Sequence, residues 1–167
     1  MKEIKLNLPF TDAEINSLRA NDKVLLSGIV YTARDQAHKR ILNLLEHGKP
    51  LPFDLRKTAI FYCGPSPARE GRICGAVGPT TSARMDPYTE EMLKAGLRVM
   101  IGKGDRSEQT ATLIRNYGAV YFAAIGGISA VLSRCIVSCE TFLWEDLGAE
   151  AIYRMELLNM PVFVSIV

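Results

Sequence analysis

Short, strongly apolar segments that end at glycine-containing corners recur through the middle of the chain, and they limit the folds open to it. Residues 58–63, 97–101 and 119–124 are of this kind, and segments with helical periodicity lie between them. Extended segments are also expected near both ends of the sequence. Strands and helices mixed in this way favour a layered α/β sandwich with a mixed sheet over a regular doubly wound sheet.

The remaining elements are expected from periodicity and from start and stop signals. Thr11 and Glu14 resemble a capping box that begins a helix running to about Leu18. Asp86 is expected to cap a helix that Gly96 closes. Further helices are expected over 36–47, up to about 117 and, in short form, after Gly126-Gly127, and further strands over 3–8, 24–31, 72–77, 134–142, 151–157 and 162–167.

Length and composition indicate one compact domain. With 167 residues and 48% hydrophobic content, the chain can bury one sizeable core, and it fits a single domain over residues 1–167. Lys and Arg number 20 against 18 Asp and Glu, so there is no charge excess of the kind that drives binding to nucleic acid. No apolar run approaches the roughly 20 residues that span a bilayer, and the N-terminus lacks the apolar core of a signal peptide. A cytoplasmic protein that binds neither nucleic acid nor membrane is expected.

The four cysteines are too sparse for a disulfide-stapled scaffold, so Cys63, Cys74, Cys135 and Cys139 are expected as reduced thiols. The spacing of Cys135 and Cys139 lacks the compactness of zinc or iron–sulfur motifs. In a strand these two side chains would share one face, as buried core thiols do. No metal site is predicted in this chain.

A Gly-Pro turn at 78–79 indicates a binding site. The turn brings the hydroxyls of Thr80 and Thr81 and the guanidinium of Arg84 to one place ahead of a helix, whose free N–H groups add positive potential. The strand expected over 72–77 would place the turn at a carboxyl end, where open α/β sheets bind their ligands. A site for a small anion is therefore predicted. Alternatively, the two threonines only cap the helix.

Two further cations follow predicted strands, Arg34 after the strand over 24–31 and Lys103 after the strand over 97–101. Neighbouring strands would bring both to the edge where Arg84 lies. Three cations suit a ligand with two carboxylates better than a ligand with one. The other interpretation is three unrelated surface cations.

Asp35 and His38 lie one helical turn apart beside Arg34. They can be interpreted as an acid–base pair. A structural role, in which Asp35 holds Arg34 or His38 from the first turn of the helix, is the expected alternative.

Four motifs occur in an order that resembles class I fumarases: Thr32-Ala33-Arg34-Asp35-Gln36-Ala37-His38, Gly78-Pro79-Thr80-Thr81-Ser82-Ala83-Arg84-Met85-Asp86, Gly102-Lys103-Gly104-Asp105-Arg106-Ser107 and Gly126-Gly127. The resemblance covers essentially the whole chain. It is to the C-terminal domain of these enzymes, which in many prokaryotes is a separate β subunit, and to the related β subunit of L(+)-tartrate dehydratase. It implies a swivelling β/β/α domain.

The resemblance also implies an activity and a partner. Class I fumarases hydrate fumarate reversibly to (S)-malate with a four-iron four-sulfur cluster held by the α part, so a partner α subunit that carries the cluster and an α2β2 assembly are expected. Matched motif by motif, Arg34, Arg84 and Lys103 correspond to ligands of the substrate carboxylates. Thr80 corresponds to the proposed base, and Thr81 to a supporting hydrogen-bond donor.

The motifs leave the substrate open between fumarate and tartrate. Met85-Asp86 followed by Tyr88 is similar to the fumarase branch, whereas Thr80-Thr81-Ser82 without Ala-Gly before Arg84 is similar to tartrate dehydratases. Fumarate is the expected substrate. A non-catalytic domain that binds dicarboxylates is the alternative from another class, and an independent enzyme is disfavoured because no nucleophile–base pair stands at diagnostic spacing.

Overall fold

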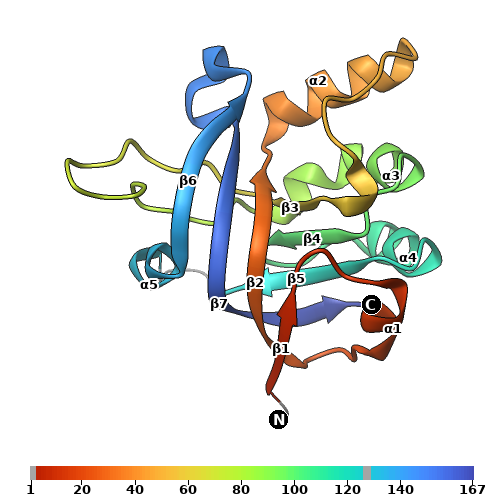
Figure 1. Cartoon of the computed structure of the whole chain (residues 1–167). Coiled ribbons are helices and arrows are strands. Elements are labelled where there is room, and N and C mark those ends of the chain that lie inside the picture. The colour runs from red at the N-terminus through yellow and green to blue at the C-terminus, as the bar shows by residue number, and fades with distance from the viewer. Residues whose placement is uncertain (1–2, 126–128) are drawn as a thin grey trace.

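The computed structural model describes residues 3–125 and 129–167 (Figure 1). In chain order the elements are β1 (Glu3–Asn7), α1 (Asp12–Ser17), β2 (Lys23–Thr32), α2 (Asp35–Glu46), η1 (Leu55–Lys57), β3 (Ala59–Phe61), η2 (Ser82–Met85), α3 (Asp86–Lys94), β4 (Val99–Gly102), α4 (Glu108–Asn116), β5 (Val120–Ala124), α5 (Ser129–Arg134), β6 (Ile136–Leu143), η3 (Glu145–Glu150) and β7 (Ile152–Ile166). The turn expected at Gly126-Gly127 lies outside the described residues.

The strands of the described residues form one mixed sheet in the order β1-β2-β3-β4-β5-β7-β6. Strands β1 to β5 pair in parallel, and β7 runs antiparallel to β2, β5 and β6. Because β7 pairs with β2 as well as with β5, strands β2, β3, β4, β5 and β7 close into a ring. The mixed α/β sheet expected from the sequence is confirmed.

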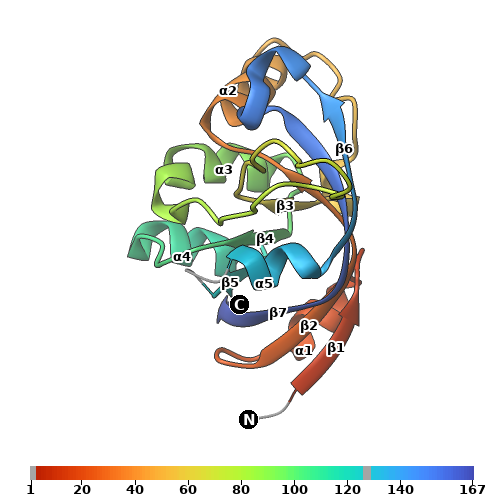
Figure 2. The same ribbon diagram turned by 90° about the vertical axis from the view of Figure 1, so that its left-hand side faces the viewer.

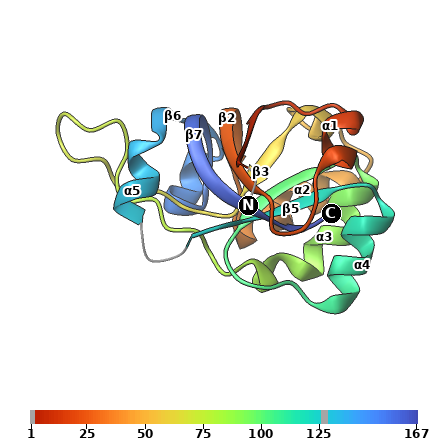
Figure 3. The same cartoon turned by 90° about the horizontal axis from the view of Figure 1, so that it is seen from below.

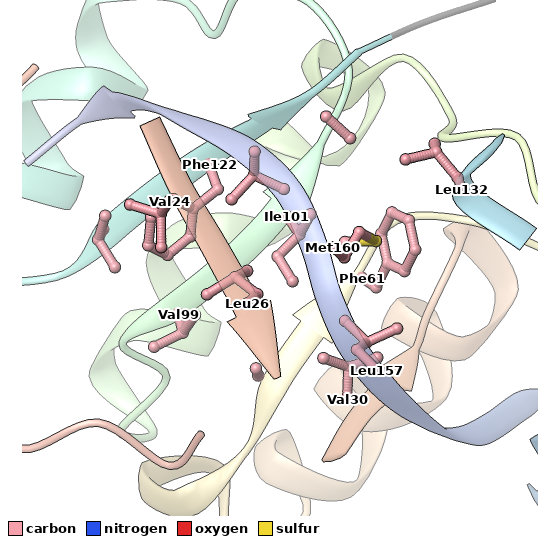
Figure 4. Close-up of a cluster of buried hydrophobic side chains, with 14 of the residues drawn as sticks. Val24, Leu26, Val30, Phe61, Val99, Ile101, Phe122, Leu132, Leu157 and Met160 are labelled. Carbon is pink, nitrogen blue, oxygen red and sulfur yellow. The ribbon is translucent and has the colours of Figure 1, made fainter. Parts of the chain in front are cut away.

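Successive residues of β3, β4 and β5 face two different cores. Phe61, Ile101 and Phe122 point into the ring, where they meet side chains from β2 and β7 (Figure 4). Ile60 and Met100 point the other way, into a second cluster that includes apolar residues of α2, α3 and α4. Figure 2 shows these helices on one side of β3–β5 and the antiparallel strands on the other. Burial on both faces explains why these strands are apolar without alternation.

Of the two expected helix starts at Thr11 and Asp86, one is confirmed and one is not. Thr11 and Glu14 form both hydrogen bonds of a capping box at the start of α1. The expectation that Asp86 caps α3 is wrong: Met85 is the cap residue, and the Asp86 carboxylate instead accepts hydrogen bonds from Arg106 Nε at 2.6 Å and from the backbone N–H of Ser107 at 3.0 Å. A buried guanidinium therefore takes the carboxylate that the helix end was expected to use.

The strand expected over 72–77 is also wrong. This segment belongs to a long loop between β3 and η2, which projects beyond β6 and α5 in Figures 1 and 3. Part of its backbone bonds within the loop, where the Ser66 N–H donates to the Ala76 carbonyl at 3.0 Å and the Ala76 N–H donates to Ser66 Oγ at 2.8 Å. The Val77 N–H instead donates to Ser133 Oγ of α5 at 3.3 Å. Because β3 already has β2 and β4 on its two sides, it leaves no edge for the segment to join.

The two strands expected at the C-terminus are one strand, β7. The pairing of β2 with β7 shifts register opposite residues 158 and 159, and Asn159 has a φ of 51°. A bulge that uses asparagine in the left-handed region bends the strand without ending it. The bend allows β7 to pair with β6 first and with β5 later along its length.

Candidate functional site

Three corners of the chain meet where the parallel strands β2, β3 and β4 end. Thr32 pairs with Phe61, and Phe61 pairs with Ile101, so the three strand ends lie side by side. Arg34 follows β2 and Lys103 follows β4. Both cations therefore stand at one edge of the sheet.

The Gly-Pro turn reaches the same edge by a different route from the one expected. The Thr80 N–H donates to the Tyr62 carbonyl at 2.6 Å, just past the end of β3. Pro79 forms an isolated bridge with Cys63, and Thr81 forms a parallel bridge with Lys103. The ends of β3 and β4 thus hold the turn in place, although no strand leads into it.

Arg34 carries a buried donor without a partner. Its Nε has no hydrogen bond among the described residues, an uncommon condition for a buried polar atom. The side chain passes close to Gly64, where an added Cβ would stand 3.0 Å from Arg34 Cδ and 3.1 Å from Nη1. An acceptor on a ligand is the group that would satisfy this donor.

Arg84 is joined to Asp35 by an ion pair of 2.9 Å. The Arg84 side chain is 56% exposed and that of Asp35 18% exposed, so the guanidinium keeps a solvent-facing side that can meet a ligand. The pair links the start of α2 to η2. Asp35 therefore binds Arg84, and no hydrogen bond to Arg34 or His38 is formed by its carboxylate in the described part of the chain.

The hydroxyls at the turn have no partner within residues 3–125 and 129–167. Thr81 precedes η2 but its side chain makes no capping hydrogen bond, and the half-buried Thr80 makes none through its hydroxyl either. The exposed ammonium of Lys103 likewise has no ion pair in the described residues. Side-chain capping of η2 therefore does not account for these threonines.

His38 is buried away from this group. Its Nδ1 lies 2.8 Å from the Arg34 carbonyl, and its ring stacks on Tyr88 with centroids 5.4 Å apart. Burial lowers the pKa of His38 to about 4, so the imidazole is neutral near pH 7 and Nδ1–H donates to the carbonyl. The arrangement gives His38 a structural role that was not predicted, as a support for the backbone of Arg34, and shows no direct contact with Asp35.

Comparison with known proteins assigns the chain to a family. The family model described as the fumarase C-terminus matches residues 1–167. The chain belongs to the fumarase C-terminus family. The mitochondrial fumarate hydratase 1 of Leishmania major is 36% identical over 167 residues, which cover 98% of this chain and 30% of that protein.

Two other relatives of this fumarase-family chain differ in length. The aerobic class I fumarate hydratase of Escherichia coli (strain K12) is 32% identical over 167 residues, covering 98% of the chain and 30% of that protein. The putative L(+)-tartrate dehydratase subunit beta of Methanocaldococcus jannaschii is 35% identical over 161 residues, covering 93% of the chain and 83% of that protein. The chain thus spans less than a third of either fumarate hydratase and most of the tartrate dehydratase subunit.

A buried network beneath the site was missed in the sequence. Arg106 is 8% exposed and lies between the rings of Tyr62 and Tyr121, 5.3 and 5.1 Å from their centroids. It donates to Asp86 and to Thr89 Oγ1. The network fixes the start of α3 against the corner that carries Lys103. Spacing alone gave no signal for it, because Arg106 sits in a motif otherwise typical of an exposed corner.

The described residues of this fumarase-family chain do not fit an iron–sulfur cluster. Residues 3–125 and 129–167 contain no group of three His, Cys, Asp or Glu side chains arranged to hold a metal ion. All four cysteines are free thiols, and none of them belongs to such a group. Separately, none of the described helices is both long and apolar enough to cross a membrane.

Proposed function

We propose that this chain is the substrate-binding β subunit of a fumarase-type hydro-lyase, which hydrates fumarate reversibly to (S)-malate. In this proposal Arg34, Arg84 and Lys103 bind the two carboxylates of the substrate. Thr80 is the proposed base that removes the proton from the substrate carbon, and Thr81 donates a supporting hydrogen bond.

One observation carries the proposal: the buried Nε of Arg34 lacks an acceptor at the edge where two more cations and two free hydroxyls gather. A buried donor without a partner destabilises the fold by roughly 1–3 kcal/mol, so such a donor is retained where a ligand satisfies it. A carboxylate is the acceptor that guanidinium donors bind in bidentate fashion. A ligand with two carboxylates would engage Arg34 at one end and the Arg84–Lys103 side at the other.

The proposed chemistry suits fixed cations. Dehydration removes a proton from the carbon next to a carboxylate, and negative charge builds up on that carboxylate in the transition state. Cations held by Asp35 and by the strand ends stabilise this charge without reorganising. A threonine hydroxyl is a weak base in water, so Thr80 needs a neighbouring group that accepts its proton.

The proposal includes a partner. The family relatives that this chain matches over 30% of their length contain other sequence beyond the matched part. We assign the four-iron four-sulfur cluster to a partner α subunit, in an α2β2 assembly, because the described residues of this chain do not fit a cluster. The three layers of helices, parallel strands and antiparallel strands support the assignment of a swivelling β/β/α domain.

L(+)-tartrate is the second candidate substrate. It is favoured by the tartrate dehydratase subunit, of which the chain covers 83%. Both substrates carry two carboxylates, so the cations alone do not separate them. Relative kcat/KM for (S)-malate and L(+)-tartrate decides between the two reactions.

The test is reconstitution with a cluster-bearing α chain under anaerobic conditions, followed by assays of fumarate hydration and tartrate dehydration. Arg84→Ala in the assembled enzyme should lower kcat/KM about 100-fold, because a charge-assisted contact to the transition state is lost. Arg115→Ala, which removes an exposed arginine near the end of α4, is the matched control and should leave the rate unchanged.

The outcomes separate the function classes. Native turnover by Arg84→Ala would refute the site assignment. Tight binding of succinate by a chain that forms no complex with any cluster-bearing protein would favour a non-catalytic dicarboxylate-binding domain. Hydratase activity of the chain alone would show an independent enzyme.

A further inference from the structure

We infer that Ser82 is a positioning residue, whose buried side chain locks the turn of Thr80 and Thr81 to the corner of Lys103. The inference rests on the proposed function, since it concerns how the two halves of the proposed dicarboxylate site keep their spacing. Ser82 itself faces away from solvent, so it does not contact the substrate.

Ser82 and Lys103 are joined by two reciprocal hydrogen bonds. The Ser82 N–H donates to the Lys103 carbonyl at 2.9 Å, and the Lys103 N–H donates to Ser82 Oγ at 2.9 Å. Together with the bridge between Thr81 and Lys103, these bonds hold η2 beside the end of β4. One of the two reciprocal bonds depends on the serine side chain.

The hydroxyl is anchored from its other side by a tyrosine of β5. The Tyr121 hydroxyl lies 2.8 Å from Ser82 Oγ and 2.7 Å from the Gly104 carbonyl. Serine can donate one hydrogen bond and accept another, so the hydroxyls and the Lys103 amide are all satisfied. Because Gly104 directly follows Lys103, Tyr121 fixes the same corner at a second point.

The space around Ser82 is closed. A Cβ added at Gly102 would stand 1.8 Å from Ser82 Oγ and 2.8 Å from Tyr62 Cδ2. The serine hydroxyl therefore fills the volume above the last residue of β4. Close packing of this kind leaves the hydroxyl one place to sit, as a positioning role requires.

The consequence for the site follows from the chain order. Thr80 and Thr81 directly precede Ser82, and the flexible side chain of Lys103 leaves from the backbone that Ser82 binds. Loss of the hydroxyl frees the Lys103 amide and widens the range of positions open to its ammonium. The loss therefore acts on substrate through Lys103, while Arg34 stands at a separate corner.

A double-mutant cycle in the assembled enzyme tests this route. Ser82→Ala should lower kcat/KM about 10-fold, mainly through a higher KM, and Lys103→Met about 100-fold. The double variant should lose about 100-fold, because backbone bonds to the Tyr62 and Lys103 carbonyls still hold the turn of Thr80 and Thr81, and the Ser82 side chain has nothing left to position once the ammonium is gone. In the Arg34→Met background, the loss in kcat/KM from Ser82→Ala should instead multiply fully with the loss from Arg34→Met.

Two control variants separate an effect on the site from a general loss of stability. Thr58→Val removes a buried hydroxyl whose bond of 2.6 Å to the Asp54 carbonyl lies at the opposite end of β3, and its kcat/KM should stay native. Tyr121→Phe leaves Ser82 its Lys103 amide and should give a loss of about 3-fold that also disappears in the Lys103→Met background.

The two possible failures differ. Absence of dicarboxylate hydro-lyase activity in the native assembly overturns the proposed function and the inference with it. The inference alone is overturned if the native assembly is active and the losses in kcat/KM from Ser82→Ala and Tyr121→Phe multiply fully with the loss from Lys103→Met, as they do with the loss from Arg34→Met.

Discussion

Substitution of Gly64 by alanine should weaken the candidate site without removing a charged group. Gly64 lies just beyond β3, between Arg34 and the chain of η3. An added Cβ would stand 2.5 Å from the Ala149 carbonyl oxygen, 3.0 Å from Arg34 Cδ and 3.1 Å from Arg34 Nη1. Because two of these atoms belong to the guanidinium arm, the methyl group must displace either Arg34 or the backbone of residue 149.

The size of the effect follows from these distances. Backbone must move by roughly 0.5 Å before the contact with Ala149 reaches even 3.0 Å, and overpacking of this kind destabilises proteins by about 1–3 kcal/mol. Displacement of Arg34 weakens a hydrogen bond to a carboxylate, which contributes about 1.5–3 kcal/mol. We therefore expect a fall in substrate affinity of about 10- to 100-fold.

Two measurements check the reasoning. Urea unfolding gives the loss of stability, and the KM of the assembled enzyme, or succinate binding to the chain, gives the loss of affinity. Gly78→Ala in the same loop is the matched control, since no atom lies within 4 Å of its added Cβ, and both quantities should stay native. A Gly64→Ala variant with native substrate affinity would refute the claim that the site requires Arg34 to pack against this glycine.

Three further substitutions have separate outcomes. Arg106→Leu should lower the free energy of unfolding by about 3–5 kcal/mol in urea titrations, because it leaves the Asp86 carboxylate without its buried partner; unchanged stability would contradict this. Asp35→Asn should change stability by less than about 1 kcal/mol, since Arg84 is largely exposed, yet raise KM several-fold; a native KM would show that Arg84 needs no tether. Burial lowers the pKa of His38 from 6.5 to about 4, so between these pH values the unfolded chain binds a proton at this residue and the folded chain does not. Stability should therefore fall by up to about 3 kcal/mol as pH drops from 6.5 to 4, and His38→Asn should flatten this slope.

The sequence predicts the fold where burial controls the pattern. The segment around Phe61 is apolar throughout because both of its faces are covered, and the capping box at Thr11 needs only local hydrogen bonds. Both signals can be recognised from one sequence, because they depend on neighbouring residues. The position of Arg34 and Lys103 at strand ends follows for the same reason, since each stands directly after a segment of this kind.

The errors arise where a distant residue decides the local structure. Asp86 was expected to cap a helix, but a guanidinium 20 residues later takes its carboxylate. The bulge at Asn159 lets β7 continue past a point that reads as a break. The sequence gives no signal that Ser82 is a supporting residue, because its partners Lys103 and Tyr121 are adjacent to it only in the folded chain.

The proposed proton transfer needs a group that the described residues next to the turn do not supply. Asp35 is tied to Arg84, and His38 is buried, neutral near pH 7 and engaged through Nδ1 with a backbone carbonyl. Both side chains are thus engaged with other groups. The cations around Thr80 ease loss of that proton but do not accept it. On the proposed function, we expect a side chain of the partner subunit to supply the acceptor, and activity at Thr80 should then require the assembled enzyme.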